Sequence, residues 1–275
     1  MIQDIGIVDT KKIINIIKEK YNYDYKEYAQ TSLKRRLILY INSNNYNNIN
    51  DFIHRLEENK KAFDDFYEET FIEETEMFRD PSLWRELRDK YLSGYIGNRD
   101  LKIWIAGATS GDEIFTLAII LKEMKVLDRV KIYVSCGSEK RIEKIKAGGI
   151  YDIKKIEISE ANYVRFSGKY SFQDYYTINN NKAYMKEELL KNVEFKFHNI
   201  INEDTFSSFK VIFCRNQMIY LNPNLTEHVA NKIVNSLMVG GILIIGSKET
   251  FGGYAIEKKL NLVNKIEKIY KKRID

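Results

Sequence analysis

The chain has 275 residues, of which 44% are hydrophobic and 30% charged, a balance typical of a soluble globular protein. It contains no apolar run long enough to span a membrane and no export signal at its N-terminus, so we expect a cytoplasmic protein. A net charge of +5 is too weak to indicate nucleic-acid binding, and two cysteines with three scattered histidines are too few for a disulfide framework or a zinc site. We therefore expect no metal, and we expect Cys136 and Cys214 to be buried, reduced thiols.

The first 75 residues contain only helical patterns. Apolar residues recur at helical spacing over residues 13–21 and again over residues 33–41, and an Asn-rich loop is expected over residues 42–50. The sequence therefore predicts an all-α N-terminal domain over residues 1–75. The apolar residues behind this prediction are Ile13, Ile14, Ile17, Tyr21, Leu33, Leu37, Tyr40, Ile41, Phe52, Leu56, Phe63, Phe66 and Tyr67.

Three consecutive basic residues, Lys34, Arg35 and Arg36, lie at the beginning of the second predicted helix. Residues 1–50 carry eight Lys and Arg against five Asp and Glu, whereas residues 51–80 carry four against eleven. A local basic face suits an acidic protein partner, although a charged run also occurs on helix faces that contact only water.

From residue 101 the pattern changes to strands that alternate with helices. This alternation predicts an α/β domain over residues 76–275, with a doubly wound parallel sheet. Gly240 and Gly241 are expected to separate the last helix from the last strand. The predicted strands are residues 101–106, 130–136, 211–214 and 242–245, and the predicted helices are residues 112–124, 138–147 and 225–237.

One stretch breaks the alternation. Residues 162–198 contain three short segments with alternating polarity around an Asn179-Asn180-Asn181 turn. We expect them to form a small antiparallel β-subdomain, inserted between a helix and a strand of the larger domain. The three predicted strands contain Tyr163–Phe166, Tyr175–Ile178 and Val193–Phe197.

A glycine-bearing turn, residues 107–111, follows the first predicted strand. In open parallel sheets such a turn lies beside a nucleotide-like ligand, because glycine lets the backbone approach closely. The turn lacks the G-x-G-x-x-G spacing of dinucleotide-binding proteins, and similar turns are often purely structural. It therefore indicates a ligand edge of the sheet without identifying the ligand.

Five segments in a fixed order resemble the CheR-type chemoreceptor methyltransferases, and together they cover nearly the whole chain. The most specific is Phe213–Tyr220, FCRNQMIY, which is similar to the family's F-C-R-N-V-x-I-Y-F. Trp104–Thr116 is similar to its W-s-a-g-C-S-T-G-E-E-P-Y-S. The others are Glu74–Asp80, like E-T-x-F-F-R-D, Ala147–Tyr151, like A-x-x-G-x-Y, and Gly246–Phe251, like G-H-S-E-x-F.

The resemblance implies an S-adenosylmethionine-dependent protein-glutamate O-methyltransferase that leaves S-adenosylhomocysteine as product. Its implied substrates are glutamate side chains on the cytoplasmic signalling helices of chemoreceptors, the methyl-accepting chemotaxis proteins. The basic cluster Lys34, Arg35 and Arg36 would face those helices. The implied fold is a helical domain followed by a Rossmann-like methyltransferase domain with a small β-subdomain, which agrees with the patterns above.

The resemblance also implies roles for individual residues. Thr75, Arg79 and Asp112 would contact the cofactor near its methionine end, and Asn199 and Ile200 would lie beside its adenine. The residues themselves leave other interpretations open: a salt bridge for Arg79, a match to a helix N-terminus for Asp112 and an ordinary turn for Asn199. Arg79 and Tyr220 are the implied catalytic pair. Near the methyl-accepting carboxylate, the resemblance places Arg215, Asn216 and Tyr220. The remaining residues implied to bind the cofactor are Glu73, Gly107, Gly137 and Glu139, together with Arg215 and Asn216.

The implied reaction needs no general base. A glutamate carboxylate is ionised at neutral pH, and a methyl group on a sulfonium sulfur is already electrophilic. The enzyme must align the two groups and exclude water. Arg79 and Tyr220 suit this task because both side chains hydrogen-bond carboxylates.

The end of the second strand departs from the family pattern. The family has an Asp there that hydrogen-bonds the ribose, whereas this chain has Gly137-Ser138-Glu139, so Glu139 would have to replace it. Without a replacement, cofactor binding would weaken by about 1.5–3 kcal/mol. A non-catalytic binding or sensory module with a decayed cofactor site is therefore the alternative function.

The inserted β-subdomain also departs from the pattern. Some family members bind a receptor's tail peptide through a glycine-rich motif, but residues 167–181 contain a single glycine, Gly168. We therefore do not expect tail-peptide binding. The basic helical domain and the inserted strands favour a protein substrate over a small molecule.

Overall fold

The computed structural model describes residues 3–26, 28–70, 75–95 and 101–274. The chain divides into two compact units. One comprises Met1–Ile72 with Met218–Val229, and the other comprises Glu73–Gln217 with Ala230–Asp275. A segment from late in the chain thus belongs with the N-terminal helices, which the sequence patterns did not predict.

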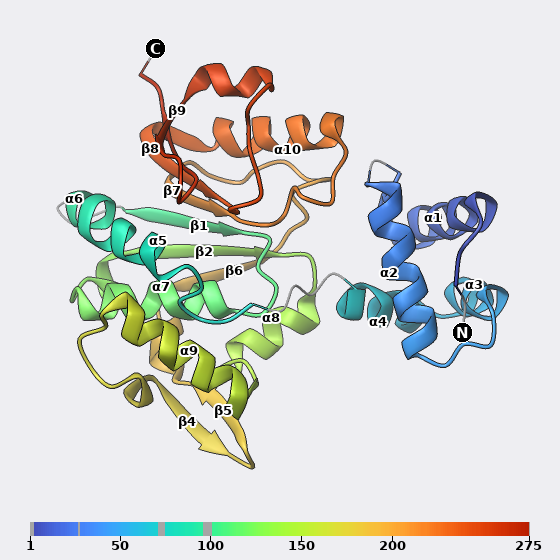
Figure 1. The fold of residues 1–275 in the computed structure, drawn as a ribbon, viewed down its shortest axis with the longest axis horizontal. Helices are drawn as coiled ribbons and strands as arrows, with labels where there is room; N and C mark the ends of the chain where they lie inside the picture. The colour runs from blue at the N-terminus through green and yellow to red at the C-terminus, as the bar shows by residue number, and fades with distance from the viewer. Residues whose placement is uncertain (1–2, 27, 71–74, 96–100, 275) are drawn as a thin grey trace. The chain divides into compact units, whose positions relative to one another are not determined.

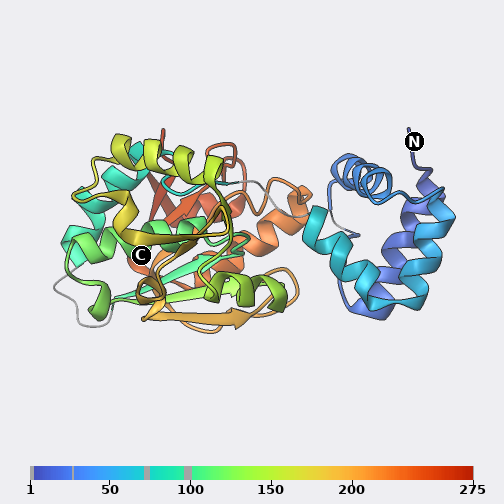
Figure 2. The same cartoon turned by 90° about the horizontal axis from the view of Figure 1, so that it is seen from below.

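The N-terminal unit is built from amphipathic helices, as predicted (Figures 1 and 2). Their apolar faces meet in an aromatic core, where Tyr40, Phe52 and Phe66 have ring centroids 5.3 to 5.7 Å apart. At the beginning of the third helix, the Asn48 side chain accepts a hydrogen bond from the Asp51 amide, which caps the helix. The helices are α1 (Ile7–Tyr21), α2 (Gln30–Ser43), α3 (Ile49–Glu58) and α4 (Lys60–Thr70).

The late segment Met218–Val229 joins this unit through its backbone. The Ala29 amide donates a hydrogen bond to the Tyr220 carbonyl oxygen at 2.8 Å, and Tyr28 pairs with Leu221 in an isolated antiparallel bridge. Helix α10 (Pro223–Asn235) begins in this segment and ends in the second unit. One continuous helix therefore contributes to both units.

The second unit contains a seven-stranded sheet with the order β6-β2-β1-β7-β8-β10-β9. The first five strands of this order are parallel, and β10 and β9 are antiparallel, which confirms the predicted, mostly parallel sheet. Ile103 and Ile105 face the core beside α7, whereas Trp104 packs on Phe206 and Phe209 at the opposite face. The strands are β1 (Lys102–Ala106), β2 (Lys131–Cys136), β6 (Val193–Phe197), β7 (Phe209–Cys214), β8 (Leu237–Ile245), β9 (Leu260–Asn264) and β10 (Ile269–Lys272).

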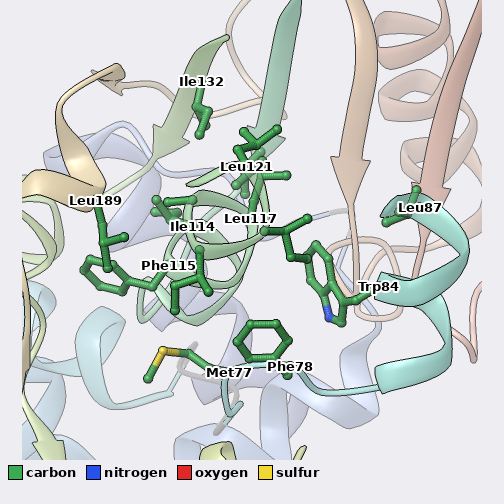
Figure 3. Packing of buried hydrophobic residues seen from close by; sticks show 14 of the residues in the cluster. Met77, Phe78, Trp84, Leu87, Ile114, Phe115, Leu117, Leu121, Ile132 and Leu189 are labelled. Carbon is green, nitrogen blue, oxygen red and sulfur yellow. The ribbon is translucent and has the colours of Figure 1, made fainter. Parts of the chain in front are cut away.

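Helix α7 is the central helix of the second unit, since it is apolar and buried on nearly every side. Figure 3 shows the side chains of Met77, Phe78 and Trp84 beside those of α7. The core therefore fixes both α5, which contains Trp84, and the segment that precedes it. The helices of this unit are α5 (Pro81–Glu86), a π-helical turn (Leu87–Leu92), α6 (Ser93–Tyr95), α7 (Asp112–Glu123), α8 (Glu139–Lys146) and α9 (Ile153–Phe166). Short 3-10 turns span Leu127–Arg129, Phe172–Tyr175, Glu187–Leu190 and Ala255–Lys259.

A small antiparallel sheet with the order β3-β5-β4 is present, as predicted in kind. Its strands are β3 (Tyr151–Asp152), β4 (Tyr176–Asn179) and β5 (Lys182–Met185). The last two form a hairpin around Asn180 and Asn181, whose positive φ angles suit the predicted turn.

Two of the predicted strands of this subdomain are wrong. Tyr163–Phe166 is the last turn of α9, because Tyr163 and Phe166, three residues apart, both pack on Phe78. Val193–Phe197 is β6, which pairs with β2 at the edge of the large sheet. An edge strand that is partly exposed has an alternating polarity, which is why it resembled an antiparallel strand.

The glycines before the last predicted strand also have another role. Strand β8 begins at Leu237, so Gly240 and Gly241 lie within it. The pairing with β7 shifts register there, and Gly240 adopts a positive φ of 68° that glycine allows at low cost. Within the described ranges, no helix combines the length and the apolar character that crossing a membrane requires.

Candidate functional site

The strand order of the large sheet reverses between β1 and β7. From β1 the chain continues to β2 and β6 on one side, and then returns to β7 on the other. Ligands of open parallel sheets bind at such a point, beyond the carboxyl ends of the strands. The turn after β1 and the residues after β7 are neighbours at this edge, so two of the predicted motifs are brought together.

The turn after β1 needs its glycines. Gly107 and Gly111 have φ angles of 76° and 88°, and the Ala108 amide donates a hydrogen bond to the Ser135 carbonyl oxygen of β2. A Cβ atom on Gly107 would overlap the side chain of Gln217. Gln217 is not among the residues that the resemblance implies for the site, although it stands where the family motif has Val.

Asp112 is buried at the beginning of α7, with 1% of its surface exposed. Its Oδ2 accepts hydrogen bonds from Ser110 and from the Lys155 ammonium, the latter at 3.3 Å. Its Oδ1 has no partner among the described residues. Burial raises the pKa of Asp112 to about 6, against the opposing effects of Lys155 and Ser110. An unsatisfied buried acceptor fits a ligand that presents a hydrogen-bond donor, such as an ammonium group.

Arg215 follows β7 and is 7% exposed. Its guanidinium donates to Glu113 Oε1 at 2.8 Å and also to Asp80. Burial alone would lower the pKa of Arg215, but the two carboxylates outweigh burial and raise it. Arg215 thus connects β7 to α7 and to the residue before α5, and its charge is already compensated by two acids.

A pocket of about 220 Å³ lies beside this ion-pair cluster. Its walls include Asp80, Arg215 and Ser247, together with Glu267 from the turn between β9 and β10. The Arg215 Nε also lacks a hydrogen-bond partner among the described residues. The cluster therefore combines compensated charges with room for a polar group.

The segment that carries Arg79 is fixed by side chains of two helices. The Phe78 amide donates to Thr116 Oγ1 of α7 at 2.9 Å, and the Met77 amide donates to Ser159 Oγ of α9 at 3.2 Å. The Arg79 carbonyl oxygen accepts from the indole of Trp84 at 2.8 Å. These bonds hold the Arg79 backbone. Thr75 and Arg79 are half-buried, and Glu73 lies outside the described residues.

Asn216 adopts a left-handed conformation with a φ of 57° after β7. The buried Glu249 holds it there, because Glu249 Oε2 accepts from the Asn216 amide at 2.9 Å and from the Gly246 amide at 2.6 Å. A Cβ atom on Gly246 would overlap Asn216, so this position also needs glycine. The late motif Gly246–Phe251 thus supports the Asn216 turn, a structural role that its sequence alone did not indicate.

The edge beyond β2 and β6 carries the remaining predicted cofactor residues. Glu139 is exposed in the first turn of α8, two residues after Gly137. The Asn199 side-chain oxygen accepts from the Ile201 amide at 3.0 Å, which makes it part of an ordinary turn, and Ile200 is buried. The Lys232 ammonium of α10 donates to the carbonyl oxygens of Ile201 and Glu203, at 3.2 and 2.8 Å, and holds the loop.

Tyr220, the second predicted catalytic residue, belongs to the N-terminal unit. The Arg36 guanidinium carbon lies 3.9 Å from the centroid of its ring. Arg36 is therefore in contact with Tyr220, whereas its neighbour Arg35 is exposed and Lys34 is partly exposed.

No group of three or more His, Cys, Asp or Glu side chains in the described part of the chain is arranged to hold a metal ion. Cys136 and Cys214 are both buried, as predicted, and the described residues contain no disulfide.

A glycine turn beside a buried acid, at the reversal point of a mostly parallel sheet, places a ligand site beyond the carboxyl ends of β1 and β7. Residues 73–266 match the family model "CheR methyltransferase, SAM binding domain", and residues 9–70 match "CheR methyltransferase, all-alpha domain". The chain belongs to the CheR methyltransferase family. It is an enzyme, and S-adenosylmethionine is its cofactor.

Two curated relatives match over most of their length. The Cher3 protein of Pseudomonas putida, assigned as a methyltransferase, is 29% identical over 265 residues, which cover 96% of this chain and 97% of Cher3. The chemotaxis protein methyltransferase of Borreliella burgdorferi is 28% identical over 259 residues, or 89% of each chain. Among solved structures, the N-methyltransferase NodS of Bradyrhizobium japonicum WM9 with S-adenosyl-L-homocysteine has a TM-score of 0.38 and 12% identity, over 74% of this chain and 90% of NodS.

Proposed function

We propose that the protein methylates glutamate side chains on the cytoplasmic signalling helices of chemoreceptors, and that it acts in the cytoplasm. The proposal depends most on Asp112, a buried acid with an unsatisfied oxygen at the reversal point of the sheet. The chain joins this site to a helical unit with a basic segment on α2. The names of the relatives, chemotaxis protein methyltransferases, support the choice of substrate.

The residues at the sheet edge fit the cofactor. Asp112 Oδ1 would accept a hydrogen bond from the ammonium group at the methionine end of the cofactor. Thr75 and Arg79 would contact the same end of the cofactor, as the resemblance implies. Glu139 would accept from the ribose hydroxyls in place of the family's Asp, and the loop at Asn199 and Ile200 would border the adenine. Glu73, Gly107, Gly137 and Asn216 complete the proposed cofactor set. Bound S-adenosylmethionine supplies an electrophilic methyl group on a sulfonium sulfur.

Arg79 and Tyr220 are the proposed catalytic residues. Both would hydrogen-bond the acceptor carboxylate and orient one of its oxygens, and a carboxylate that is ionised at neutral pH needs no base. Arg215 has a different role in this proposal. Because Glu113 and Asp80 already engage its charge, it would organise the site and would not bind the acceptor carboxylate directly.

Substrate recognition is proposed for the basic segment of α2. Lys34 and Arg35 would face the acidic receptor helices, because opposite charges steer association and set specificity. No tail-peptide contact is proposed for the small β-sheet.

Methyl transfer to receptors tests the function directly. The purified protein, incubated with methyl-labelled cofactor and receptor fragments from the same genome, should form base-labile methyl esters. Receptor variants with the acceptor glutamates changed to Ala should form none. If the protein binds S-adenosylhomocysteine but labels no receptor, the proposed substrate is wrong.

A further inference from the structure

Arg36 and Tyr220 are 184 positions apart in the sequence yet form a stacked pair within one compact unit. The guanidinium carbon lies 3.9 Å from the ring centroid, well within the range of a cation–π interaction. The Tyr220 backbone is held by the same region, because its carbonyl oxygen accepts from the Ala29 amide at 2.8 Å. Leu221 is held beside it by its bridge to Tyr28. Both the ring and the backbone of Tyr220 are thus fixed by residues 28–36.

Arg36 is well placed to hold the ring in one orientation. Leu33 and Leu37 on the same helix are buried, with 2% and 0% exposure, and they anchor α2 in the helical core. The stem of Arg36 therefore projects from a fixed backbone. A Tyr ring that stacks on a fixed, planar guanidinium loses rotational freedom, and so its hydroxyl keeps one position.

We propose that Arg36 is a positioning residue for Tyr220, and so serves the methyl-transfer step through Tyr220. The resemblance places Arg36 with Lys34 and Arg35 on a surface that contacts the receptor; the geometry gives it a separate task. This inference rests on the proposed function, because it takes Tyr220 as a group that orients the acceptor carboxylate.

A double-mutant cycle on the full chain separates the two roles. Arg36→Gln should lower kcat by roughly two- to thirtyfold, the range of a cation–π contact, with a smaller change in receptor KM. In a Tyr220→Phe background the same change should cost much less, because the hydroxyl to be positioned is already gone. Arg36→Lys should restore part of the loss since it keeps the cation, and Arg36→Leu should not.

Arg35 provides the matched control, because Arg35→Gln removes the same charge from the adjacent, exposed position. Its effect should be the same in the wild-type and Tyr220→Phe backgrounds. Affinity for S-adenosylhomocysteine should be unchanged in Arg36→Gln, which shows that the second unit is folded. Equal losses for Arg36→Gln in both backgrounds would overturn the proposal.

A spectroscopic measurement is independent of turnover. In protein with 13C-labelled tyrosine, the Tyr220 ring signal is identified by its absence in Tyr220→Phe. It should shift in Arg36→Gln and keep its position in Arg35→Gln, without cofactor or receptor present. An unchanged ring signal in Arg36→Gln overturns the positioning role. If the wild-type protein methylates no receptor, the proposed function fails, but the ring signal still decides whether Arg36 positions Tyr220.

Discussion

Gln217 lies across Gly107, and its side-chain Nε2 donates a hydrogen bond to the Gly107 carbonyl oxygen at 2.9 Å. This bond joins the end of β7 to the turn after β1, at the point where the strand order reverses. The two positions are therefore coupled, although they are 110 residues apart.

Gly107→Ala should destabilise the protein and weaken cofactor binding. The Cβ atom would overlap Gln217, and a non-glycine residue at a φ of 76° costs about 1–2 kcal/mol. Urea unfolding should show this loss, and adding Gln217→Ala should recover only the part due to the overlap. Full recovery in the double variant would mean that the backbone conformation is not strained.

The affinity for S-adenosylhomocysteine should depend on pH through Asp112. An ammonium ligand prefers the ionised carboxylate, and burial raises the pKa of Asp112 to about 6 in the free protein. Affinity should therefore fall about tenfold per pH unit below 6 and become constant above it. Calorimetry from pH 5 to 8 measures this, and Asp112→Asn should bind weakly with no such dependence. A steep dependence in Asp112→Asn would assign the titration to another group.

The same shift has a consequence for stability. The folded protein holds the Asp112 proton more tightly than the unfolded chain, where the pKa is ordinary. The free energy of unfolding of the ligand-free protein should therefore fall as the pH rises from about 4 through about 6. Asp112→Asn should reduce this slope, and an unchanged slope would show that other groups produce it.

Arg215→Met should be strongly destabilising. It leaves Glu113 and Asp80 without their cation, and because these side chains are 24% and 39% exposed, the loss should lie between about 1 kcal/mol for an exposed pair and about 3–5 kcal/mol for a fully buried one. Chemical denaturation of the variant against Arg129→Met, an exposed arginine of the same unit, measures the difference. A loss below about 1 kcal/mol would mean that the cluster is open to water.

Glu139→Gln tests whether this acid replaces the family's ribose-binding Asp. Affinity for S-adenosylhomocysteine should fall roughly tenfold to hundredfold, the size of a lost charged hydrogen bond. Glu143→Gln is the control, because Glu143 is exposed one turn further along α8. Equal affinities in the two variants would show that Glu139 does not bind the cofactor. In that case Gly137→Asp should increase the affinity, because it supplies the missing acid.

The sequence predicted the elements whose signals are local. Apolar runs identified β1 and β2, and helical spacing identified the helices of the N-terminal unit. The errors arose where the environment of a segment depends on distant partners. The pattern of Val193–Phe197 reflects an edge position beside β2, which no local pattern reveals.

The candidate site was predictable as a set of motifs but not as a set of contacts. The resemblance placed Arg215 near the acceptor carboxylate. In the structure its two carboxylate partners, Glu113 and Asp80, lie 102 and 135 positions away in the sequence. The resemblance likewise placed Arg36 with Arg35, because adjacent residues look equivalent in a sequence. Only the three-dimensional packing separates an exposed arginine from one that stacks on Tyr220.

The inclusion of Met218–Val229 in the N-terminal unit bears on how the chain can be synthesised and divided. On the ribosome, the first 72 residues leave the exit tunnel long before Met218–Val229, so the backbone contacts of Tyr28 and Ala29 with this segment can form only after the intervening sheet has been made. A fragment ending at residue 72 should keep the helical core, which residues 5–66 form, but should lack the segment that pairs with Tyr28 and Ala29. A fragment starting at residue 73 should expose the strip around Tyr220 and Leu221, so neither half is a natural unit for expression.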